Sequence, residues 1–535
     1  MSPILEFRGA SVAYGFGPDR TEAVRDVSLA VESGDTLGLA GESGCGKTTL
    51  AMSVLRLLPR SAQVTGEVLL DGRDVSTLSF GELRAARWAS ASVVFQGAMH
   101  ALNPVQTIGA QIAEPLKLHA GKSAPSATAL RRRVEELLAQ VELPTARADA
   151  YPHELSGGQK QRVMIAMALA CDPRLIIADE PTTALDVVVQ AQILALLGRL
   201  VSERGIALVM ISHDLSVLAA ACERIVVMYE GNLVEEGPSK QVMAQPHHAH
   251  TRALAEAFPV VGDRSFRYAE PHTPVGEPLL SAHELAVTFS DRSGRQVRAV
   301  RGVDLEVGRD EIVALVGQSG SGKTTLARSL LGLQKPTSGV ARFGGVALPT
   351  SRAELRAYRR KVQLILQDPT GALNPRHSVY EAVAEGLRIH GVADDERGRV
   401  LAALEAAELR PAEKFVARLP HELSGGQRQR VVIAGALVLE PEVLVADEPV
   451  ASLDATVRGE ILALLLRLRV QRGLSTLVIT HDLGLAWNIA DRVAVMYRGE
   501  LVEVGTVEQV LLDPRHDYTK TLLSSVPSLD RRATS

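Results

Sequence analysis

The stretch "PHELSGGQKQRVMIAMAL" occupies residues 152–169, and "PHELSGGQRQRVVIAGAL" occupies residues 420–437 of the same chain. The match continues at the same spacing, since "ADEP" occurs at 178–181 and again at 446–449. The two copies are 268 positions apart, far more than the roughly 20–50 residues of a solenoid unit. The repeat therefore predicts two tandem copies of one domain.

The start of the repeat and the segment between its copies set the expected boundaries. "GESGCGKTT" at 41–49 pairs with "GQSGSGKTT" at 317–325. Residues 261–277, "VGDRSFRYAEPHTPVGE", match neither copy and are rich in Pro, Gly and charge, as linkers are. We expect domain 1 at 4–260, a linker at 261–277, domain 2 at 278–528 and a short polar tail at 529–535.

The pattern of apolar runs predicts an α/β fold for each copy. Apolar runs that end in glycine stand directly before both glycine-rich stretches, and helix-like sequence follows them. Strands that alternate with helices are typical of a mainly parallel sheet. We expect an antiparallel β subdomain from the N-terminal stretch of each copy. The stretches 105–150 and 376–418 should form an α-helical subdomain beside the sheet.

The length, net charge and cysteine content of the chain limit the classes of function that it can have. The chain has 535 residues and a formal net charge of −4, which argues against a nucleic-acid partner because phosphate contacts need a basic face. Its three cysteines cannot build a disulfide framework or a four-thiolate metal site. No apolar run reaches about 18 residues, and the N-terminus lacks signal-peptide features. We expect a cytosolic protein that does not itself span a membrane.

Both glycine-rich stretches fit GxxxxGK[ST], the pattern of a P-loop. Glycines let backbone N–H groups fold around phosphate oxygens, and the helix that starts there adds its positive end. We expect Lys47 and Lys323 to reach the β- and γ-phosphates, and Thr48 and Thr324 to hold Mg²⁺. The other candidates for binding ATP in these loops are Gly41, Ser43, Gly44, Cys45, Gly46 and Thr49, with Gly317, Ser319, Gly320, Ser321, Gly322 and Thr325.

Two acidic residues end an apolar strand in each copy. Asp179 and Asp447 suit an Mg²⁺ partner held through water. Glu180 and Glu448 follow directly, and a carboxylate beside the γ-phosphate can orient and deprotonate the attacking water. An Asp-Glu pair at a strand end is by itself usually a cap or a solvated turn. Beside a P-loop, the catalytic interpretation is favoured.

Together these motifs resemble the ATP-binding cassette (ABC) ATPases, and the resemblance covers nearly the whole chain. LSGGQ is the signature of that family, and it is highly specific when a P-loop accompanies it. The resemblance implies a P-loop (RecA-like) core and two cassettes that close head to tail, with the signature of one over the ATP of the other. Lys47 should then face Ser424, and Lys323 should face Ser156. The signature residues expected at ATP are Ser156, Gly157, Gly158 and Gln159, with Ser424, Gly425, Gly426 and Gln427.

The resemblance also implies roles for residues outside these motifs. Gln96 and Gln367 match the Q-loop, which senses Mg²⁺ and water, and His213 and His481 match the histidine that positions the γ-phosphate. The D-loop residues are Asp186 and Asp454, and the aromatic residues expected to stack on adenine are Tyr14 and Phe289. Because no motif residue is visibly lost in either copy, we expect both sites to hydrolyse ATP.

Two finer features resemble those of the oligopeptide/dipeptide importer ATPases. In this chain the two ATP-binding subunits of such an importer would be fused into one polypeptide. "ALNP" follows each Q-loop, at 101–104 and 372–375, and matching tails occupy 241–259 and 509–527. The resemblance implies a peripheral motor at the cytoplasmic face of the inner membrane. It would drive peptide uptake through two integral-membrane permease subunits supplied by an extracytoplasmic solute-binding protein. Relatives in this branch import peptides, glutathione or nickel.

Three details bear on the tails and the Q-loops. Neither tail contains a cysteine, so we expect no iron–sulfur cluster of the kind that several peptide-importer ATPases carry. "PHHAH" at 246–250 could suggest a metal site, but its counterpart "PRHDY" favours a helix start. Gly97 follows the first Q-loop glutamine where an acidic residue is usual, whereas the second copy keeps Asp368. This difference could reflect two different permease contacts.

Other classes of tandem ABC protein fit the sequence less well. A translation factor that acts on ribosomes would have a longer, basic linker. A DNA-repair ATPase would need zinc-binding cysteines, and a sugar-importer ATPase usually loses catalytic residues in its second half. Co-purification with permeases or with ribosomes separates the importer from the translation factor.

Overall fold

The computed structural model describes residues 3–15, 20–97, 101–120, 125–183, 185–257, 259–270, 272, 276–290, 296–392, 394–451 and 453–526. The expected tail at 529–535 and parts of the expected linker therefore lie outside the described residues. The chain divides into two compact units, the first formed mainly by residues 1–185 and 189–258 and the second by Pro259–Val526 together with Asp186–Val188. Each unit contains one copy of the repeat.

A six-stranded, mainly parallel sheet forms the centre of each unit, as the sequence predicts. In the first unit the order is β10-β9-β3-β8-β7-β6, and only the edge strand β10 runs antiparallel to its neighbour. These strands are β3 (Thr36–Ala40), β6 (Ala91–Val94), β7 (Leu175–Asp179), β8 (Ala207–Ser212), β9 (Arg224–Tyr229) and β10 (Asn232–Pro238). Strands β7 and β8 are buried along their whole length, which explains their continuous apolar sequence.

The second unit repeats this sheet in the order β16-β17-β18-β13-β19-β20, again with one antiparallel edge strand, β20. Its strands are β13 (Ile312–Val316), β16 (Val362–Ile365), β17 (Val443–Asp447), β18 (Ser475–Thr480), β19 (Arg492–Tyr497) and β20 (Glu500–Thr506). The strand before the P-loop lies between β8 and β9 in the first sheet and between β18 and β19 in the second. The P-loop therefore starts at the centre of the carboxyl edge of the sheet.

A second, antiparallel sheet of four strands accompanies each core. In the first unit it consists of β1 (Leu5–Tyr14), β2 (Thr21–Val31), β4 (Ala62–Leu70) and β5 (Arg73–Asp74). In the second it consists of β11 (Leu280–Ser290), β12 (Gln296–Val307), β14 (Ser338–Phe343) and β15 (Val346–Ala347). Inward residues such as Val24 and Val300 are buried in one core with the central sheet. The predicted antiparallel subdomain is confirmed.

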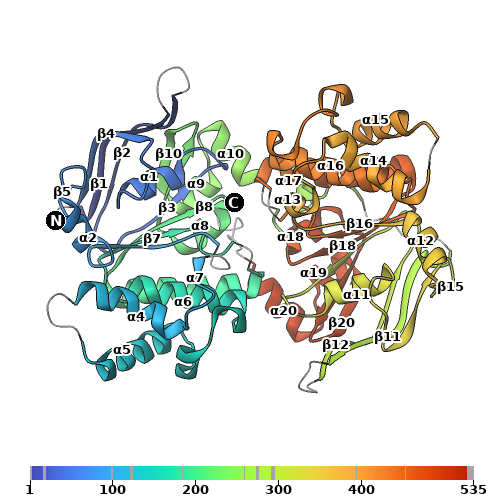
Figure 1. The fold of residues 1–535 in the computed structure, drawn as a ribbon, viewed down its shortest axis with the longest axis horizontal. Helices are drawn as coiled ribbons and strands as arrows, with labels where there is room; N and C mark the ends of the chain where they lie inside the picture. The colour runs from blue at the N-terminus through green and yellow to red at the C-terminus, as the bar shows by residue number, and fades with distance from the viewer. Residues whose placement is uncertain are drawn as a thin grey trace. The chain divides into compact units, whose positions relative to one another are not determined.

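The predicted helical subdomains are also present, set apart from the antiparallel strands within each unit (Figure 1). They contain α4 (Ile108–His119), α5 (Ala127–Gln140) and α6 (Gly157–Leu169) in the first unit, and α14 (Val379–His390), α15 (Glu396–Ala406) and α16 (Gly425–Leu437) in the second. On α5, Arg131 and Arg132 form ion pairs with Glu135 at 2.7 Å and Glu136 at 2.9 Å. These i,i+4 pairs identify a solvated helix face.

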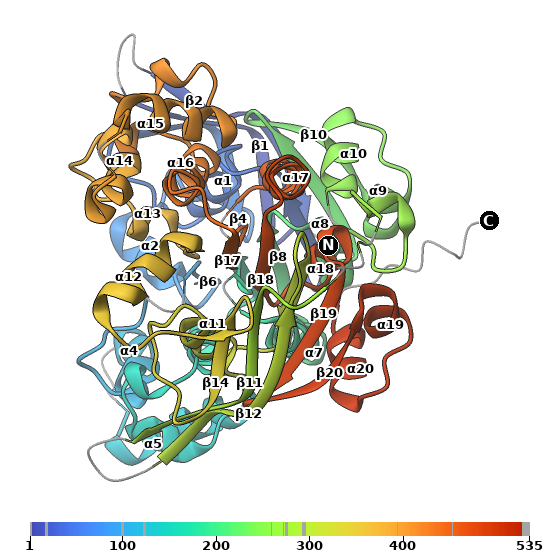
Figure 2. The same ribbon diagram turned by 90° about the vertical axis from the view of Figure 1, so that its right-hand side faces the viewer.

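Each unit ends in a strand followed by two short helices. These helices are α9 (Ser239–Ala244) and α10 (Ala249–Glu256) after β10, and α19 (Val507–Leu512) and α20 (Asp517–Ser524) after β20 (Figure 2). The side chain of His248 accepts the N–H of His250 at the start of α10, and His516 caps α20 in the same way. The helix-start interpretation of "PHHAH" is thus confirmed.

The described part of the expected linker forms hydrogen bonds with the rest of the second unit. The indole N–H of Trp487 donates to the carbonyl oxygen of Asp263 at 2.9 Å, and Arg267 donates to the carbonyl oxygens of Trp487 and Ala490 at 2.8 and 3.1 Å. The indole of Trp487 is fully buried. This segment is therefore a packed part of the second unit rather than a free tether. Across the part of the chain that the structure describes, no helix has the length and apolar character needed to cross a bilayer.

Candidate nucleotide-binding and hydrolysis sites

The P-loops connect β3 to α1 (Lys47–Ser53) and β13 to α11 (Lys323–Leu330). Their first glycines, Gly41 and Gly317, have positive φ angles of 147° and 152°. A Cβ atom there would lie 2.4 Å from the carbonyl oxygen of Met228 and 2.2 Å from that of Met496. Only glycine fits, because both the backbone angle and the neighbouring backbone exclude a side chain. This close approach fixes the base of each loop on the strand beside it.

The two P-loop lysines lie inside their own loops. The amino group of Lys47 donates to the carbonyl oxygens of Gly41 at 2.8 Å and Glu42 at 2.6 Å. Lys323 donates to those of Gly317 at 2.6 Å and Gln318 at 3.0 Å. Both side chains are buried, and burial lowers the pKa of Lys323. The ammonium groups are thus held where an entering phosphate could take over their hydrogen bonds.

In each unit the structure brings together the threonine and the aspartate that were predicted to hold Mg²⁺. The hydroxyl of Thr48 donates to a carboxylate oxygen of Asp179 at 3.2 Å, and Thr324 donates to Asp447 at 3.3 Å. Burial raises the pKa of both aspartates. A hydroxyl and a carboxylate at one point are oxygen donors of the kind that Mg²⁺ prefers, so the residues present fit this ion.

The first predicted catalytic carboxylate has two side-chain partners that the sequence also singled out. Glu180 accepts the amide N–H of Gln96 at 2.8 Å through one oxygen, and its other oxygen lies 3.1 Å from Nδ1 of His213. Burial alone would raise the pKa of Glu180, but the hydrogen bond and charge of His213 outweigh it and lower the pKa. The backbone of Glu180 has a positive φ of 44°, a strained conformation of the kind found at functional sites.

The second carboxylate has a related but different set of contacts. Glu448 lies 2.6 Å from Nδ1 of His481 and accepts the backbone N–H of His481 at 3.1 Å and the hydroxyl of Thr480 at 3.3 Å. Burial would lower the pKa of His481, but the bond to Glu448 and its charge raise it. Within the described ranges, Gln367 makes no bond to Glu448 like that of Gln96 to Glu180. The two sites are therefore alike in residues but not identical in contacts.

The signature serines begin helices in both units. Ser156 and Ser424 are the N-cap residues of α6 and α16, and each forms a reciprocal capping box with the glutamine three positions later, Gln159 or Gln427. The N–H groups at these helix starts, including those of Gly157 and Gly425, are the kind of groups that bind anions. The structure thus places Ser, Gly and Gln of each signature at one helix N-terminus.

The second glycine of each signature has a packing role that the sequence reasoning missed. Gly158 faces Val189 of α7 (Val187–Arg204), and Gly426 faces Val457 of α17 (Ala455–Arg472). A Cβ atom at either glycine would lie 2.4 or 2.5 Å from a valine methyl carbon. The signal available in the sequence was a valine 31 residues after the glycine in both copies.

The structure places the remaining predicted residues on strands β1 and β11 and directly before helices α7 and α17. The hydroxyl of Tyr14 lies 3.1 Å from that of Thr49 on α1, so its ring is next to the P-loop helix. Phe289 is 43% exposed near the end of β11, which leaves its ring accessible for stacking. The D-loop residues Asp186 and Asp454 directly precede α7 and α17.

The residues after the Q-loop glutamines differ for a local reason. Asp368 accepts the N–H of Thr370 at 2.8 Å and caps the short helix α13 (Pro369–Ala372), whereas Gly97 has a positive φ of 76°. The acidic residue of the second copy is thus a helix cap. In the first P-loop, Cys45 is a small buried residue whose sulfur lies 3.5 Å from the amino group of Lys47.

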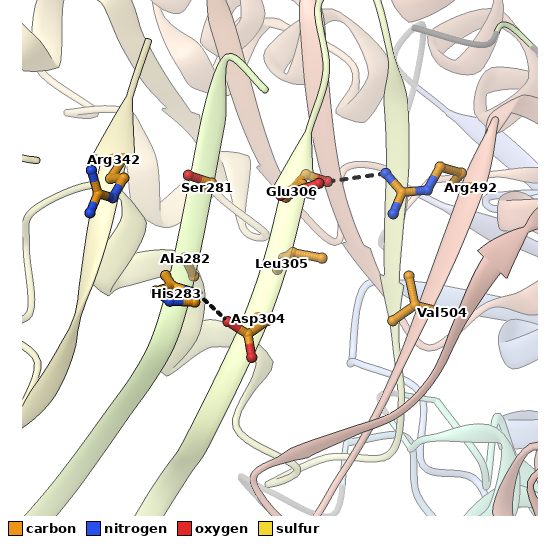
Figure 3. A pocket seen from close by; sticks show the side chains of 9 residues that line it. All are labelled: Ser281, Ala282, His283, Asp304, Leu305, Glu306, Arg342, Arg492 and Val504. Carbon is orange, nitrogen blue, oxygen red and sulfur yellow. Dashed lines mark hydrogen bonds and ion pairs between the residues drawn. The ribbon is translucent and has the colours of Figure 1, made fainter. Parts of the chain in front are cut away.

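A separate hollow of about 490 Å³ lies on the second unit, lined by β11, β12 and β14 together with Arg492 and Val504 (Figure 3). His283 and Asp304 form an ion pair of 2.7 Å in it, and Arg492 is paired with Glu311 at 3.3 Å. Because these charges are already compensated, and because no predicted site residue lines the hollow, we do not assign the nucleotide to it.

The duplicated P-loop, acidic pair, histidine and signature helix define an ATPase of the ABC class. The family model described as "ABC transporter" matches residues 24–183 and 300–451, and the chain belongs to this family. The model described as "Oligopeptide/dipeptide transporter, C-terminal region" matches residues 234–278 and 502–535. The chain is therefore a fused tandem-cassette ATPase of the oligopeptide/dipeptide importer branch.

Curated relatives match along nearly the whole chain. The glutathione import ATP-binding protein GsiA of Salmonella typhimurium strain LT2 is 41% identical, covering 98% of this chain and 90% of its own. GsiA of Escherichia coli strain K12 is 40% identical, with 98% and 89% covered. Among solved structures, cbiO1 from Clostridium perfringens, part of the ABC transporter complex cbiONQ, is 31% identical over 44% of this chain and 92% of that chain, with a TM-score of 0.40.

Proposed function

We propose that this chain is the ATP-hydrolysing motor that drives uptake of short peptides through separate permease subunits. The observation that carries the proposal is the double occurrence of a complete ABC motif set, each followed by the C-terminal region of oligopeptide/dipeptide transporters. We expect two integral-membrane permease subunits as partners and an extracytoplasmic solute-binding protein that delivers the solute. The motor would act as a peripheral protein at the cytoplasmic face of the inner membrane.

The names of the curated relatives support a peptide-like solute. The curated relatives are named for glutathione import, and glutathione is itself a tripeptide. Dipeptides, oligopeptides and glutathione share a backbone with an amino group and carboxylates. Within the proposal, glutathione is the specific alternative to ordinary peptides.

The proposed hydrolysis follows from the contacts around the two carboxylates. Glu180 and Glu448 would orient a water molecule and accept its proton, while His213 and His481 hold the carboxylates and the γ-phosphate in place. Mg²⁺, when bound at Thr48 and Asp179 or at the matching pair, supplies positive charge that offsets the developing negative charge on the phosphate. The lysines contribute a second positive charge once a phosphate replaces their carbonyl partners.

The proposed coupling requires both units. Each signature helix N-terminus would lie over the ATP of the opposite P-loop, with Lys47 facing Ser424 and Lys323 facing Ser156. ATP would close the two cassettes, and hydrolysis with phosphate release would reopen them. The helical subdomains, next to Gln96 and Gln367, would convey this motion to the permeases.

Reconstitution tests the function directly. The chain would be co-expressed with a candidate pair of permease subunits and placed in proteoliposomes with a candidate solute-binding protein. ATP-dependent uptake of labelled dipeptide, oligopeptide or glutathione is expected. Uptake of none of them, with a different solute stimulating ATP hydrolysis, would contradict the peptide assignment but leave the motor role standing. Co-purification with ribosomes instead of permeases would contradict the importer role.

A further inference from the structure

The second P-loop is held from outside by a tyrosine of the C-terminal tail. The backbone N–H of Gln318, the second residue of the loop, donates to the hydroxyl oxygen of Tyr518 at 2.9 Å. Tyr518 is the second residue of α20 and is buried. It lies in the segment that matches the oligopeptide/dipeptide C-terminal region. The tail therefore contacts the loop that is expected to bind phosphate.

Three contacts fix the position of Tyr518. Glu503 accepts the backbone N–H groups of Arg515 at 2.8 Å and His516 at 3.1 Å, which ties the start of α20 to β20. The His516 side chain accepts the N–H of Tyr518 at 3.1 Å. The tyrosine ring stacks on Tyr497, with 4.0 Å between the ring centroids and 24° between the planes. These contacts hold the Tyr518 side chain in one rotamer, which places its hydroxyl group at the P-loop.

The residue that Tyr518 holds also holds the P-loop lysine. The carbonyl oxygen of Gln318 accepts a hydrogen bond from the amino group of Lys323 at 3.0 Å. The preceding residue, Gly317, packs without space against the backbone of Met496. Tyr518 therefore holds the backbone of Gln318 through its N–H group. The carbonyl group of the same residue, in turn, holds the amino group of Lys323.

The first copy has no tyrosine at the corresponding position. His250 occupies the position of Tyr518, its ring lies 4.3 Å from that of Tyr229, and Glu42 occupies the position of Gln318. Among the described residues, Nε2 of His250 is buried without a hydrogen-bond partner. Both copies thus place two aromatic rings side by side here, but the tyrosine hydroxyl that bonds the loop is present at only the second of the two positions.

We propose that Tyr518 is a positioning residue of the second nucleotide site, which acts through Gln318 on Lys323. The affinity of this site for ATP then depends on a tyrosine hydroxyl group in the tail, which the first copy does not have at the corresponding position. The inference rests on the proposed function in one respect, namely that the loop containing Lys323 binds the phosphates of ATP.

The test compares Tyr518→Phe with His250→Phe in the purified full-length chain. Each removes the polar atoms of the side chain and keeps an aromatic ring at the same place in one copy. Loss of one hydrogen bond typically weakens binding by about two- to tenfold. For Tyr518→Phe we expect the KM for ATP to rise by that factor while kcat stays within about twofold of the wild type. For His250→Phe we expect the KM to stay unchanged.

Site-resolved binding completes the test. In a Lys47→Ala background, binding of a fluorescent ATP analogue reports on the second site, and Tyr518→Phe should weaken it, with an unchanged thermal unfolding midpoint. An unchanged KM in Tyr518→Phe, a fall in kcat alone, or an equal rise in His250→Phe would overturn the proposal. The proposed function is tested separately by Lys47→Ala with Lys323→Ala, which should abolish analogue binding whatever residue 518 is.

Discussion

Gly158 and Val189 leave no room for a methyl group between α6 and α7, because a Cβ atom at the glycine would lie 2.4 Å from Cγ1 of the valine. Gly426 and Val457 repeat the relationship at 2.5 Å in the second unit. The same close approach thus occurs twice in one chain. The second glycine of each signature is therefore required by helix packing, in addition to any role at the helix start.

Replacing this glycine should destabilise the fold. Alanine normally stabilises a helix interior relative to glycine, but in Gly158→Ala the overpacking should dominate and cost about 1–3 kcal/mol. Denaturant unfolding of the single variant measures the loss. The double variant Gly158→Ala with Val189→Ala should recover much of it, because the valine methyl carbon is removed. A single variant as stable as the wild type would show that the helices adjust freely.

Removing both catalytic carboxylates should separate ATP binding from turnover. In Glu180→Gln with Glu448→Gln we expect the chain to bind ATP and to hydrolyse it about 10²–10³ times more slowly, because the amide cannot accept the proton of water. Steady-state phosphate release and binding of a fluorescent analogue measure the two effects. Normal hydrolysis by this variant would refute the assignment of the base.

The proposed pairing of opposite cassettes predicts that a signature variant in one unit impairs nucleotide binding at the P-loop of the other unit. Ser424→Arg should reduce labelling of the loop that contains Lys47, because the arginine would obstruct the facing phosphate. Ser156→Arg should reduce labelling of the loop that contains Lys323. Photolabelling with an azido analogue of ATP, followed by peptide mapping, distinguishes the loops. If Ser424→Arg affected only the loop with Lys323, the pairing would be wrong.

The contact between His481 and Glu448 predicts a pH effect. Since Glu448 raises the pKa of His481, the charged imidazole is favoured in the folded chain. The associated stabilisation is then complete below the pKa of the unfolded chain and is lost as the pH rises through the raised pKa of the folded chain. Hydrogen exchange at the imidazole carbon, read by mass spectrometry, should give His481 a pKa above the ordinary histidine value. Glu448→Gln should bring that value down; an unchanged value would exclude Glu448 as the cause.

The sequence was sufficient to predict the layers of the fold, because the same strand, P-loop and signature motifs occur in both copies of the repeat. Apolar strands, P-loops and LSGGQ are local patterns, and their positions follow from chain order in an α/β sheet. The contact of Tyr518 with Gln318 was not predictable, because it joins residues 200 positions apart through a tail whose packing no local pattern specifies. The difference between the contacts of Glu180 and Glu448 was also hidden, since both copies present the same residue types.

The hydrogen bonds that join Asp263, Arg267 and His272 to the rest of the second unit have a practical consequence for dividing the protein. Asp491 accepts the backbone N–H groups of His272 and Ile312 and pairs with Arg469 at 3.0 Å. A half-protein that began at residue 278 would lose Asp263 as the partner of Trp487 and expose an indole ring to water. Expression of the C-terminal half alone should therefore begin before Asp263, and a gene split after residue 277 should give an aggregating product.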